Sequence, residues 1–199
     1  GLCIMINHGS YNPTNFELES FNRHSLYEDI ILFINELSTS FNVVVRGGLS
    51  YVLNTHDDSY YLPDIDLAMA SSLEKDLLNF IAPLNHQVYV NKSPHGKKFI
   101  SIFVKKEKYI RIDILLIKQN EASILYESIS YNKNNYNLFI TSIEDVFWDK
   151  VLKVAEKDFR NHNMMKFRKN LYVVNELLKT VIIDDNLSNE QSSVLLAAS

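Results

Sequence analysis

Cysteine is nearly absent from this sequence, since Cys3 is the only one among 199 residues. A single cysteine excludes a disulfide within the chain and fits a reducing cytoplasm. Long apolar runs are also lacking, and none approaches the roughly 18 residues that a membrane span needs. Residues 1–6 carry no basic leader and lack the Ser or Thr of a myristoylation signal, so we expect no signal peptide. These absences predict a cytoplasmic protein without a membrane partner.

Motifs of the zinc-binding type are missing too. The six histidines are scattered, and no His-x-x-x-His or Cys-x-x-Cys spacing occurs, which argues against a zinc site. The formal net charge of −4 argues against a protein that is basic throughout. Basic residues nevertheless gather in the second half, where residues 145–179 hold eight Lys or Arg against five acids. A polyanion would fit such a region.

The apolar content is high enough for a folded core. Hydrophobic residues make up 46% of the chain, and the length suits one domain, or one catalytic core with a small appendage. Periodicity, turn residues and caps predict the elements. They are helix 26–37 behind a Ser25 cap, a strand from Val43, helix 49–53, strand 64–69, helix 73–81 capped by Ser71 or Ser72, strand 86–90, hairpin strands 99–104 and 109–117, and helices 142–156 and 164–180.

The order of these elements predicts the organisation of the chain. An α/β (α+β) core with a mixed sheet spans residues 1–125, of which 1–22 form an N-terminal arm. A C-terminal helical region spans residues 126–199, and its Asn-rich segment 128–137 is predicted to be a connector.

A glycine pair stands directly after the strand that begins at Val43. Gly47 and Gly48 break the apolar run where the chain turns into a short helix. Two glycines let another group approach the backbone closely, and the amides of a helix start attract anions. We therefore expect Gly47, Gly48 and Ser50 to bind the phosphates of a nucleotide. The alternatives are a plain tight turn for the glycines and a helix cap for Ser50.

Two carboxylates follow this turn on a predicted strand. Asp64 and Asp66 are two residues apart, so a strand points both side chains to one face. Like charges held together repel unless a cation joins them, and carboxylate oxygens suit Mg²⁺, which also binds substrate phosphates. The alternative is a solvated strand edge. The adjacent acids Asp57 and Asp58 are a rival pair, but neighbours in a strand face opposite ways and make poorer joint ligands.

A third acid lies on a later predicted strand. Over residues 109–117, apolar residues alternate with Arg111 and Asp113. Asp113 therefore projects from the side opposite to the apolar residues, where it could join a metal site. Its alternative role is a salt bridge to Arg111 or to a nearby lysine.

This arrangement resembles the nucleotidyltransferase superfamily with a polymerase-β-like palm. That family has a Gly-Gly or Gly-Ser turn, an Asp-x-Asp strand and a third carboxylate on a later strand, and the likeness covers about residues 26–118. The resemblance implies a palm in which Asp64, Asp66 and Asp113 are catalytic and hold Mg²⁺ or Mn²⁺ for a two-metal reaction. Asp113 would help to accept the proton of the attacking hydroxyl. The fifteen residues between Gly48 and Asp64 slightly exceed the family's usual spacing.

The helical half resembles AbiEii-type nucleotidyltransferase toxins. Segments 144–150 and 166–172 look like the lysine-bearing helices of that family, with Asn170 where an acid would be expected. Lys150, as a catalytic residue, and Lys153, as a nucleotide-binding residue, would neutralise the triphosphate; the alternative is a solvated helix face. The resemblance also implies an RNA or tRNA acceptor and a protein antitoxin as a partner.

The expected function is that of a metal-dependent nucleotidyltransferase. It would move a nucleoside monophosphate from an NTP to a hydroxyl acceptor and release pyrophosphate. RNA, a protein hydroxyl and a small molecule of the aminoglycoside or lincosamide type all stay open as the acceptor. The alternative is a non-catalytic nucleotide-binding or interaction protein that retains the palm.

Overall fold

A computed structural model describes residues 6–8, 24–57, 59–60, 62, 64–92, 96–105, 109–118, 129–133, 136–155 and 164–179. The chain divides into two compact units, Gly1–Thr141 and Ser142–Ser199. Of the predicted arm, only the short strand Ile6–His8 lies within the described residues.

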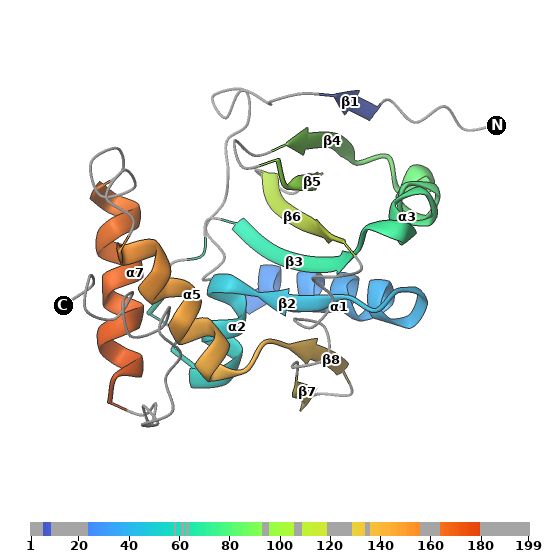
Figure 1. Ribbon diagram of the computed structural model, residues 1–199. Coiled ribbons are helices and arrows are strands. Elements are labelled where there is room, and N and C mark those ends of the chain that lie inside the picture. The colour runs from blue at the N-terminus through green and yellow to red at the C-terminus, as the bar shows by residue number, and fades with distance from the viewer. Residues whose placement is uncertain are drawn as a thin grey trace. The chain divides into compact units, whose positions relative to one another are not determined.

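One mixed sheet forms the centre of the first unit. Its eight described strands follow the order β1-β4-β5-β6-β3-β2-β8-β7, from top to bottom in Figure 1. They are β1 (Ile6–His8), β2 (Val44–Arg46), β3 (Asp64–Ala70), β4 (Gln87–Lys92), β5 (Lys98–Lys105), β6 (Tyr109–Ile117), β7 (Ile129–Lys133) and β8 (Tyr136–Ile140). The parallel pair β3 and β6 lies inside the sheet, with antiparallel β2 beside β3 and antiparallel β5 beside β6.

The side chains of β3 and β6 alternate between the two faces of the sheet. One face carries fully buried apolar residues, among them Ile65 and Ile112, which are both 0% exposed. The other face carries half-buried charged residues near the start of each strand. Residues paired across neighbouring strands share a face, so Asp64, Asp66 and Asp113 lie on the same side. The alternation predicted for both strands is confirmed.

Three described helices belong to the first unit. They are α1 (His24–Ser40), α2 (Gly47–Thr55) and α3 (Glu74–Ile81). α1 buries four apolar residues at helical spacing, and it lies beside β8. These buried residues are Ile30, Ile31, Ile34 and Leu37.

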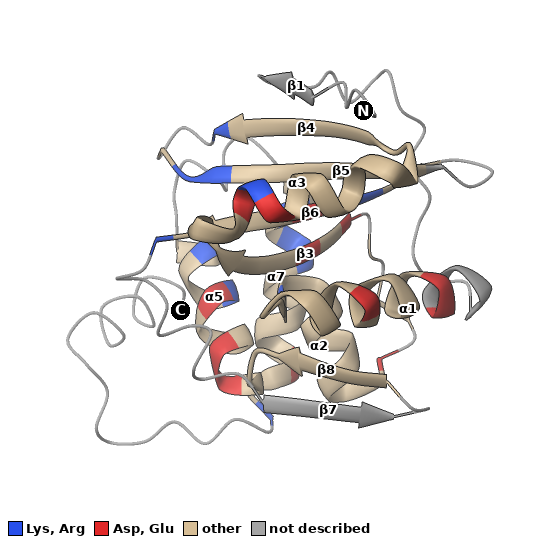
Figure 2. Cartoon of the chain, turned by 90° about the vertical axis from the view of Figure 1, so that its right-hand side faces the viewer, with Lys and Arg blue, Asp and Glu red and all other residues tan. Residues whose placement is uncertain are grey.

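The starts of α1 and α3 differ from the predicted caps. α1 begins at His24, so Ser25 lies within its first turn. A 3-10 turn, Ser71–Leu73, precedes α3, and no side chain makes a capping hydrogen bond there. Glu74 and Asp76 occupy the first turn of α3 instead, and their negative charge favours a helix start. Figure 2 colours acidic residues red, and some of them lie on α3.

The Asn-rich segment predicted as a connector contributes to two strands, so this prediction is wrong. β7 and β8 pair with each other in antiparallel fashion, and β8 also pairs with β2 in parallel. The first compact unit accordingly extends to Thr141, past the boundary predicted at residue 125. Asn has a low strand propensity, so composition hides strands that depend on pairing with their neighbours.

The second unit contains α5 (Ile143–Ala155) and α7 (Met164–Leu177), which pack against each other. The backbone N–H of Asp145 donates to Ser142 Oγ over 3.2 Å, so Ser142 caps the start of α5. A mixed-sheet α+β fold followed by helices agrees with the predicted class. Among the described helices, none has both the length and the hydrophobicity of a membrane span.

Candidate functional site

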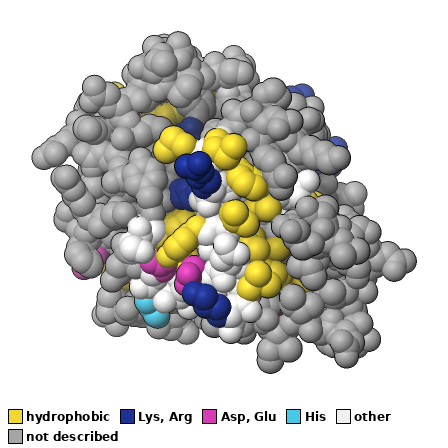
Figure 3. Space-filling model, turned by 90° about the vertical axis from the view of Figure 1, so that its left-hand side faces the viewer, with side chains coloured by type: hydrophobic (Ala, Val, Ile, Leu, Met, Phe, Trp, Pro, Cys, Tyr) yellow, Lys and Arg dark blue, Asp and Glu magenta, His cyan; other side chains and the backbone are white. Residues whose placement is uncertain are grey.

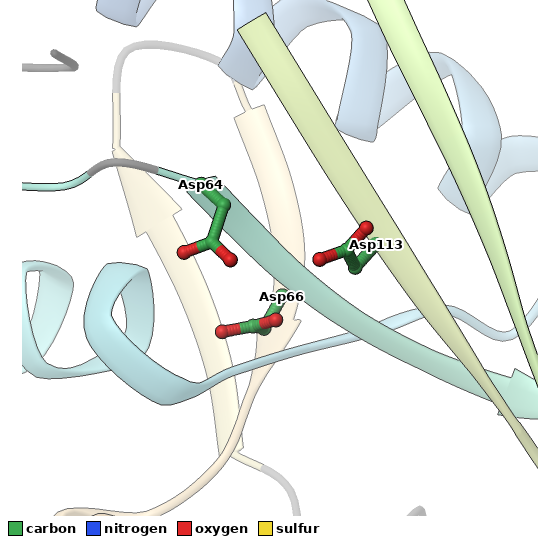
Figure 4. Close-up of side chains that lie close together, drawn as sticks. All are labelled: Asp64, Asp66 and Asp113. Atoms are coloured by element: carbon green, nitrogen blue, oxygen red, sulfur yellow. The ribbon is translucent and has the colours of Figure 1, made fainter. Parts of the chain in front are cut away.

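Three carboxylates meet where β3 begins beside the middle of β6 (Figure 4). Asp64 and Asp66 lie on one face of β3, and Asp113 is the direct register partner of Asp66. Ligand oxygens of the three side chains all lie within 4.8 Å of one another. The structure therefore brings together the three acids that the sequence singled out, from strands separated by about forty residues of chain.

The chemistry of this group fits a divalent cation. The three donors are carboxylates without nitrogen or sulfur ligands, which suits Mg²⁺ or Mn²⁺. All three are half-buried, so the strands hold them while solvent still reaches them. Figure 3 shows acidic side chains at the surface of one face, beside a Lys or Arg side chain. Asp64, Asp66 and Asp113 are thus a plausible cation site in position and composition.

Arg111 supplies a positive charge inside this group. Its guanidinium Nη2 pairs with Asp64 Oδ2, and its Nε lies 3.2 Å from Asp113 Oδ2. The Arg111 side chain is only 16% exposed, so solvent screens these pairs weakly. The salt bridge that the sequence offered as the alternative for Asp113 is therefore present, and it includes Asp64 as well. Arg111 offsets the repulsion among the three carboxylates.

Gly47 lets the start of α2 approach Asp66. Its backbone has φ +62°, in the left-handed region, and a Cβ built there would lie 2.8 Å from Asp66 Oδ2. Arg46, the preceding residue, is the register partner of Asp66 on β2. A side chain at position 47 would collide with the carboxylate, so the glycine does more than shape a turn. The first N–H groups of α2, which have no partners within the helix, thus lie next to the acids.

Gly48 meets a different requirement. A Cβ at this position would lie 2.5 Å from Leu62 Cδ2 and 3.1 Å from Tyr60 Cε1. Tyr60 also packs edge-to-face on Tyr51 of α2, with ring centroids 4.9 Å apart. Gly48 is therefore needed for the loop before β3 to pack against α2. This packing helps to fix the position of Asp64, the first residue of β3.

The rival acidic pair contributes to the loop rather than to the carboxylate group. Tyr51 Oη donates to Asp57 Oδ2 over 2.7 Å, and Ser59 Oγ donates to Asp57 Oδ1 over 2.6 Å. Both carboxylate oxygens of Asp57 therefore accept local hydrogen bonds. Asp58 lies outside the described residues.

The side chain of Ser50 lies between α2 and the residue that follows β8. Its side chain is 0% exposed, Ser50 Oγ donates to Thr141 O over 3.0 Å, and Thr141 Oγ1 donates to Ser50 Oγ over 2.8 Å. Asn54 Nδ2 donates to the carbonyl oxygen of Ser50 over 2.9 Å. These contacts join α2 to the end of β8. The Ser50 hydroxyl is thus enclosed by Thr141, and its predicted phosphate contact stays a prediction.

Lys150 and Lys153 lie on α5 in the second unit. Lys150 is buried, with 6% exposure. Lys153 Nζ lies 3.3 Å from Asp149 Oδ2, one helical turn away, and its side chain is one-third exposed. Such an exposed pair is weak, so Lys153 can exchange it for another anion.

Sequence reasoning missed two polar residues behind Asp113. Ser101 on β5 is the register partner of Asp113, and its Oγ donates to Asp113 Oδ1 over 2.7 Å. Asn91 Nδ2 on β4 donates in turn to Ser101 Oγ over 3.1 Å. A serine in an otherwise apolar predicted strand was the available signal.

No protein-family model matches this chain, and no curated protein sequence does either. Solved structures do match. An antigenic nucleotidyltransferase-like protein from Paracoccidioides brasiliensis superposes with TM-score 0.59 at 15% identity, covering 85% of this chain and 86% of that one. The antibiotic-resistance factor ANT(2'')-Ia gives TM-score 0.55 at 14% identity, covering 86% of this chain and 90% of its own.

A third similar structure is a candidate nucleotidyltransferase from Thermotoga maritima. It gives TM-score 0.53 at 15% identity, covering 75% of this chain and 94% of that one. At such identities the likeness concerns the fold alone. The chain has an α+β fold similar to that of nucleotidyltransferase-like proteins.

Proposed function

We propose that this protein is a metal-dependent nucleotidyltransferase that moves a nucleoside monophosphate from an NTP to a hydroxyl group. The observation that carries the proposal is the group of Asp64, Asp66 and Asp113 beside the Gly47 turn, with ligand oxygens within 4.8 Å of one another. The fold shared with nucleotidyltransferase-like proteins supports it.

The three carboxylates would hold Mg²⁺ or Mn²⁺. Bound there, divalent ions would supply charge neutralisation for the triphosphate and the leaving pyrophosphate, in a two-metal arrangement. We assign the N–H groups at the start of α2, from Gly47 and Gly48, to phosphate oxygens, because both the free amides and the helix dipole favour an anion.

The transfer itself makes one bond and breaks one. The acceptor oxygen bonds to the α-phosphorus of the NTP, the bond from that phosphorus to the bridging oxygen of pyrophosphate breaks, and the hydroxyl proton leaves. We assign Asp113 as the acceptor of this proton. Lys150, with Lys153 as an auxiliary, is proposed to neutralise the triphosphate.

Two kinds of acceptor have separate support. ANT(2'')-Ia, which shares the fold, has been solved in complex with adenylyl-2''-tobramycin, an adenylylated small molecule. The resemblance of the helical half to AbiEii-type toxins instead favours RNA or a tRNA end, together with a protein antitoxin as partner. The basic residues of the second half agree with an RNA acceptor.

Incubation of the protein with labelled NTPs, Mg²⁺ and an acceptor pool tests the reaction. We expect Asp64→Asn to lower label transfer and pyrophosphate release at least 100-fold, because it removes a charged ligand. Asp76→Asn, an exposed acid on α3, is the matched control and should retain wild-type transfer. Equal transfer by wild type and Asp64→Asn would refute the assigned role.

Calorimetry with NTP and Mg²⁺ distinguishes the proposed enzyme from the alternative, a protein that binds nucleotide without catalysis. Binding of NTP without pyrophosphate release, under every acceptor supplied, would identify a non-catalytic nucleotide-binding protein that retains the palm.

A further inference from the structure

We propose that Ser101 and Asn91 form a relay that positions Asp113 for cation binding. The inference rests on the proposed function and deepens it, because it assigns residues outside the carboxylate group to the same site. Neither residue would contact the substrate, so both are positioning residues.

The relay crosses three neighbouring strands in one direction. Asn91 on β4 donates from Nδ2 to Ser101 Oγ on β5 over 3.1 Å, and Ser101 donates to Asp113 Oδ1 on β6 over 2.7 Å. A serine hydroxyl has one proton. Since that proton goes to the carboxylate, Ser101 Oγ must accept from Asn91, and the orientation of both groups is determined.

The consequence for Asp113 is a fixed carboxylate plane. Rotation about the last side-chain bond of an aspartate is soft, so a free carboxylate samples a broad range of orientations. Here Oδ1 is held by Ser101, and Oδ2 lies 3.2 Å from Arg111 Nε. The hydrogen bond from Ser101 and the ion pair with Arg111 act on different oxygens, and together they restrict the orientation of the carboxylate. Ligands aligned in advance by such hydrogen bonds bind metal more tightly than free ones.

The burial of the relay argues that it serves a purpose beyond packing. Ser101 is 2% exposed. The Oδ1 atom of Asn91 is buried and has no hydrogen-bond partner among the described residues. A buried acceptor without a partner costs folding free energy. An apolar residue at position 91 would avoid that cost but would leave Ser101 Oγ without its donor.

A manganese titration followed by electron paramagnetic resonance tests the relay on the full-length chain. We expect Ser101→Ala to weaken Mn²⁺ binding about 10- to 100-fold, and Ser101→Thr, which keeps the hydroxyl, to restore most of the affinity. Asn91→Ala should weaken binding by a smaller factor. The double variant should match Ser101→Ala alone, because Asn91 acts only through Ser101.

Ile102→Val is the control for a general loss of stability. Ile102 is 0% exposed and lies next to Ser101 on the opposite face of β5, so the change removes a buried methylene without touching the relay. Thermal unfolding of every variant measures its stability. If Ile102→Val and Ser101→Ala were equally stable and weakened Mn²⁺ binding by the same factor, the relay would be refuted.

The outcomes for the wild type separate the two proposals. Saturable Mn²⁺ binding by the wild type, with unchanged affinity in Ser101→Ala, would refute the relay and leave the proposed function standing. No saturable binding by the wild type would contradict the metal site of the proposed function, and the relay with it. Additive losses in the double variant would show that Asn91 acts independently of Ser101 and would also overturn the relay.

Discussion

Two glycines with positive φ differ in what surrounds them. Gly47 has φ +62° and lies against Asp66, whereas Gly96 has φ +78° and no atom within 4 Å of the point where a Cβ would stand. We expect Gly96→Ala to lower the free energy of unfolding by about 1–2 kcal/mol, the cost of a left-handed backbone alone. Gly47→Ala should lower the free energy of unfolding by more than this, because its Cβ would displace Asp66. Since Asp66 is a proposed Mg²⁺ ligand, Mg²⁺ should stabilise the wild type but not Gly47→Ala.

Urea unfolding of both variants, with and without Mg²⁺, measures the difference. Equal losses in the two variants, with equal responses to Mg²⁺, would show that the contact between Gly47 and Asp66 does not matter to the site.

Arg111 gives a second prediction at the residue scale. Its guanidinium pairs with Asp64 and Asp113, so a bound cation and Arg111 compete for the same carboxylates. Arg111→Met should lower the metal-free stability by on the order of 1–3 kcal/mol, since the acids lose a partner in a weakly solvated place. Mg²⁺ should then stabilise the variant more than it stabilises the wild type.

Thermal unfolding over a range of Mg²⁺ concentrations checks this expectation. Arg111→Lys keeps the charge and should lie between the wild type and Arg111→Met. A smaller Mg²⁺ response in Arg111→Met would mean that Arg111 supports the cation rather than competing with it.

The acids of the candidate site and the pairing of Asp113 with Arg111 were predictable from the sequence, whereas the contacts of Ser101 and Ser50 were not. The spacing of Asp64 and Asp66 and the alternation around Asp113 depend only on strand geometry, which a sequence reveals. The burial of Ser50 was not predictable, because it depends on a contact with Thr141, ninety-one positions further along the chain. Such long-range contacts leave no local pattern in a sequence.

At the scale of elements, register decides which residues meet. The predicted hairpin strands 99–104 and 109–117 leave their register open. The observed register pairs Val104 with Ile110 and Ser101 with Asp113. A slip of one residue would place Ser101 opposite Ile112, whose side chain lies on the other face of the sheet. The contact of Asp113 with Ser101 was therefore not predictable.

The helices and central strands were easier to predict than β7 and β8, the last two strands at one end of the sheet. α1, α5 and α7 have clear apolar periodicity, and β3 and β6 have clear alternation, so each element carries its own signal. β7 and β8 do not, because an Asn-rich strand is stabilised mainly by the strand beside it.

The contact between α2 and the end of β8 supports a prediction about stability. Ser50 and Thr141 exchange buried hydrogen bonds, so Ser50→Ala leaves a buried hydroxyl and carbonyl with fewer partners. We expect a loss of about 1–3 kcal/mol in the free energy of unfolding. Because both residues belong to one network, adding Thr141→Val should cost less than the sum of the single changes.

Urea unfolding measures this loss, with Thr39→Ala as the control. Thr39 makes a similar bond to a backbone carbonyl, Oγ1 to Glu36 O over 2.7 Å, but it is exposed, so its removal should change stability by less than about 0.5 kcal/mol. A similarly small loss in Ser50→Ala would show that the network does not join the two elements.

At the scale of the whole molecule, the effect of salt on binding distinguishes an RNA acceptor from an uncharged small acceptor. The net charge is −4, yet basic residues are concentrated in the second half of the chain. An RNA that contacts three phosphates should bind roughly 20- to 40-fold more weakly when salt rises from 50 to 200 mM, because counterions are released on binding. An uncharged small acceptor should show almost no change.

Transfer of label to a tRNA pool over this range of salt, beside transfer to a small hydroxyl compound, measures the contrast. Transfer to tRNA that does not depend on salt would contradict an electrostatically bound RNA acceptor.

The place of β3 and β6 within the sheet has a consequence for amide hydrogen exchange. Each strand is hydrogen-bonded on both sides, β3 to β2 and β6, and β6 to β3 and β5. Amides of such strands exchange only when most of the sheet opens. Those of residues 66–68 and 111–115 should therefore be among the slowest in the chain, whereas β7, with a described pairing on one side only, should exchange earlier. The three carboxylates would keep their spacing through local openings and lose it only with the fold itself.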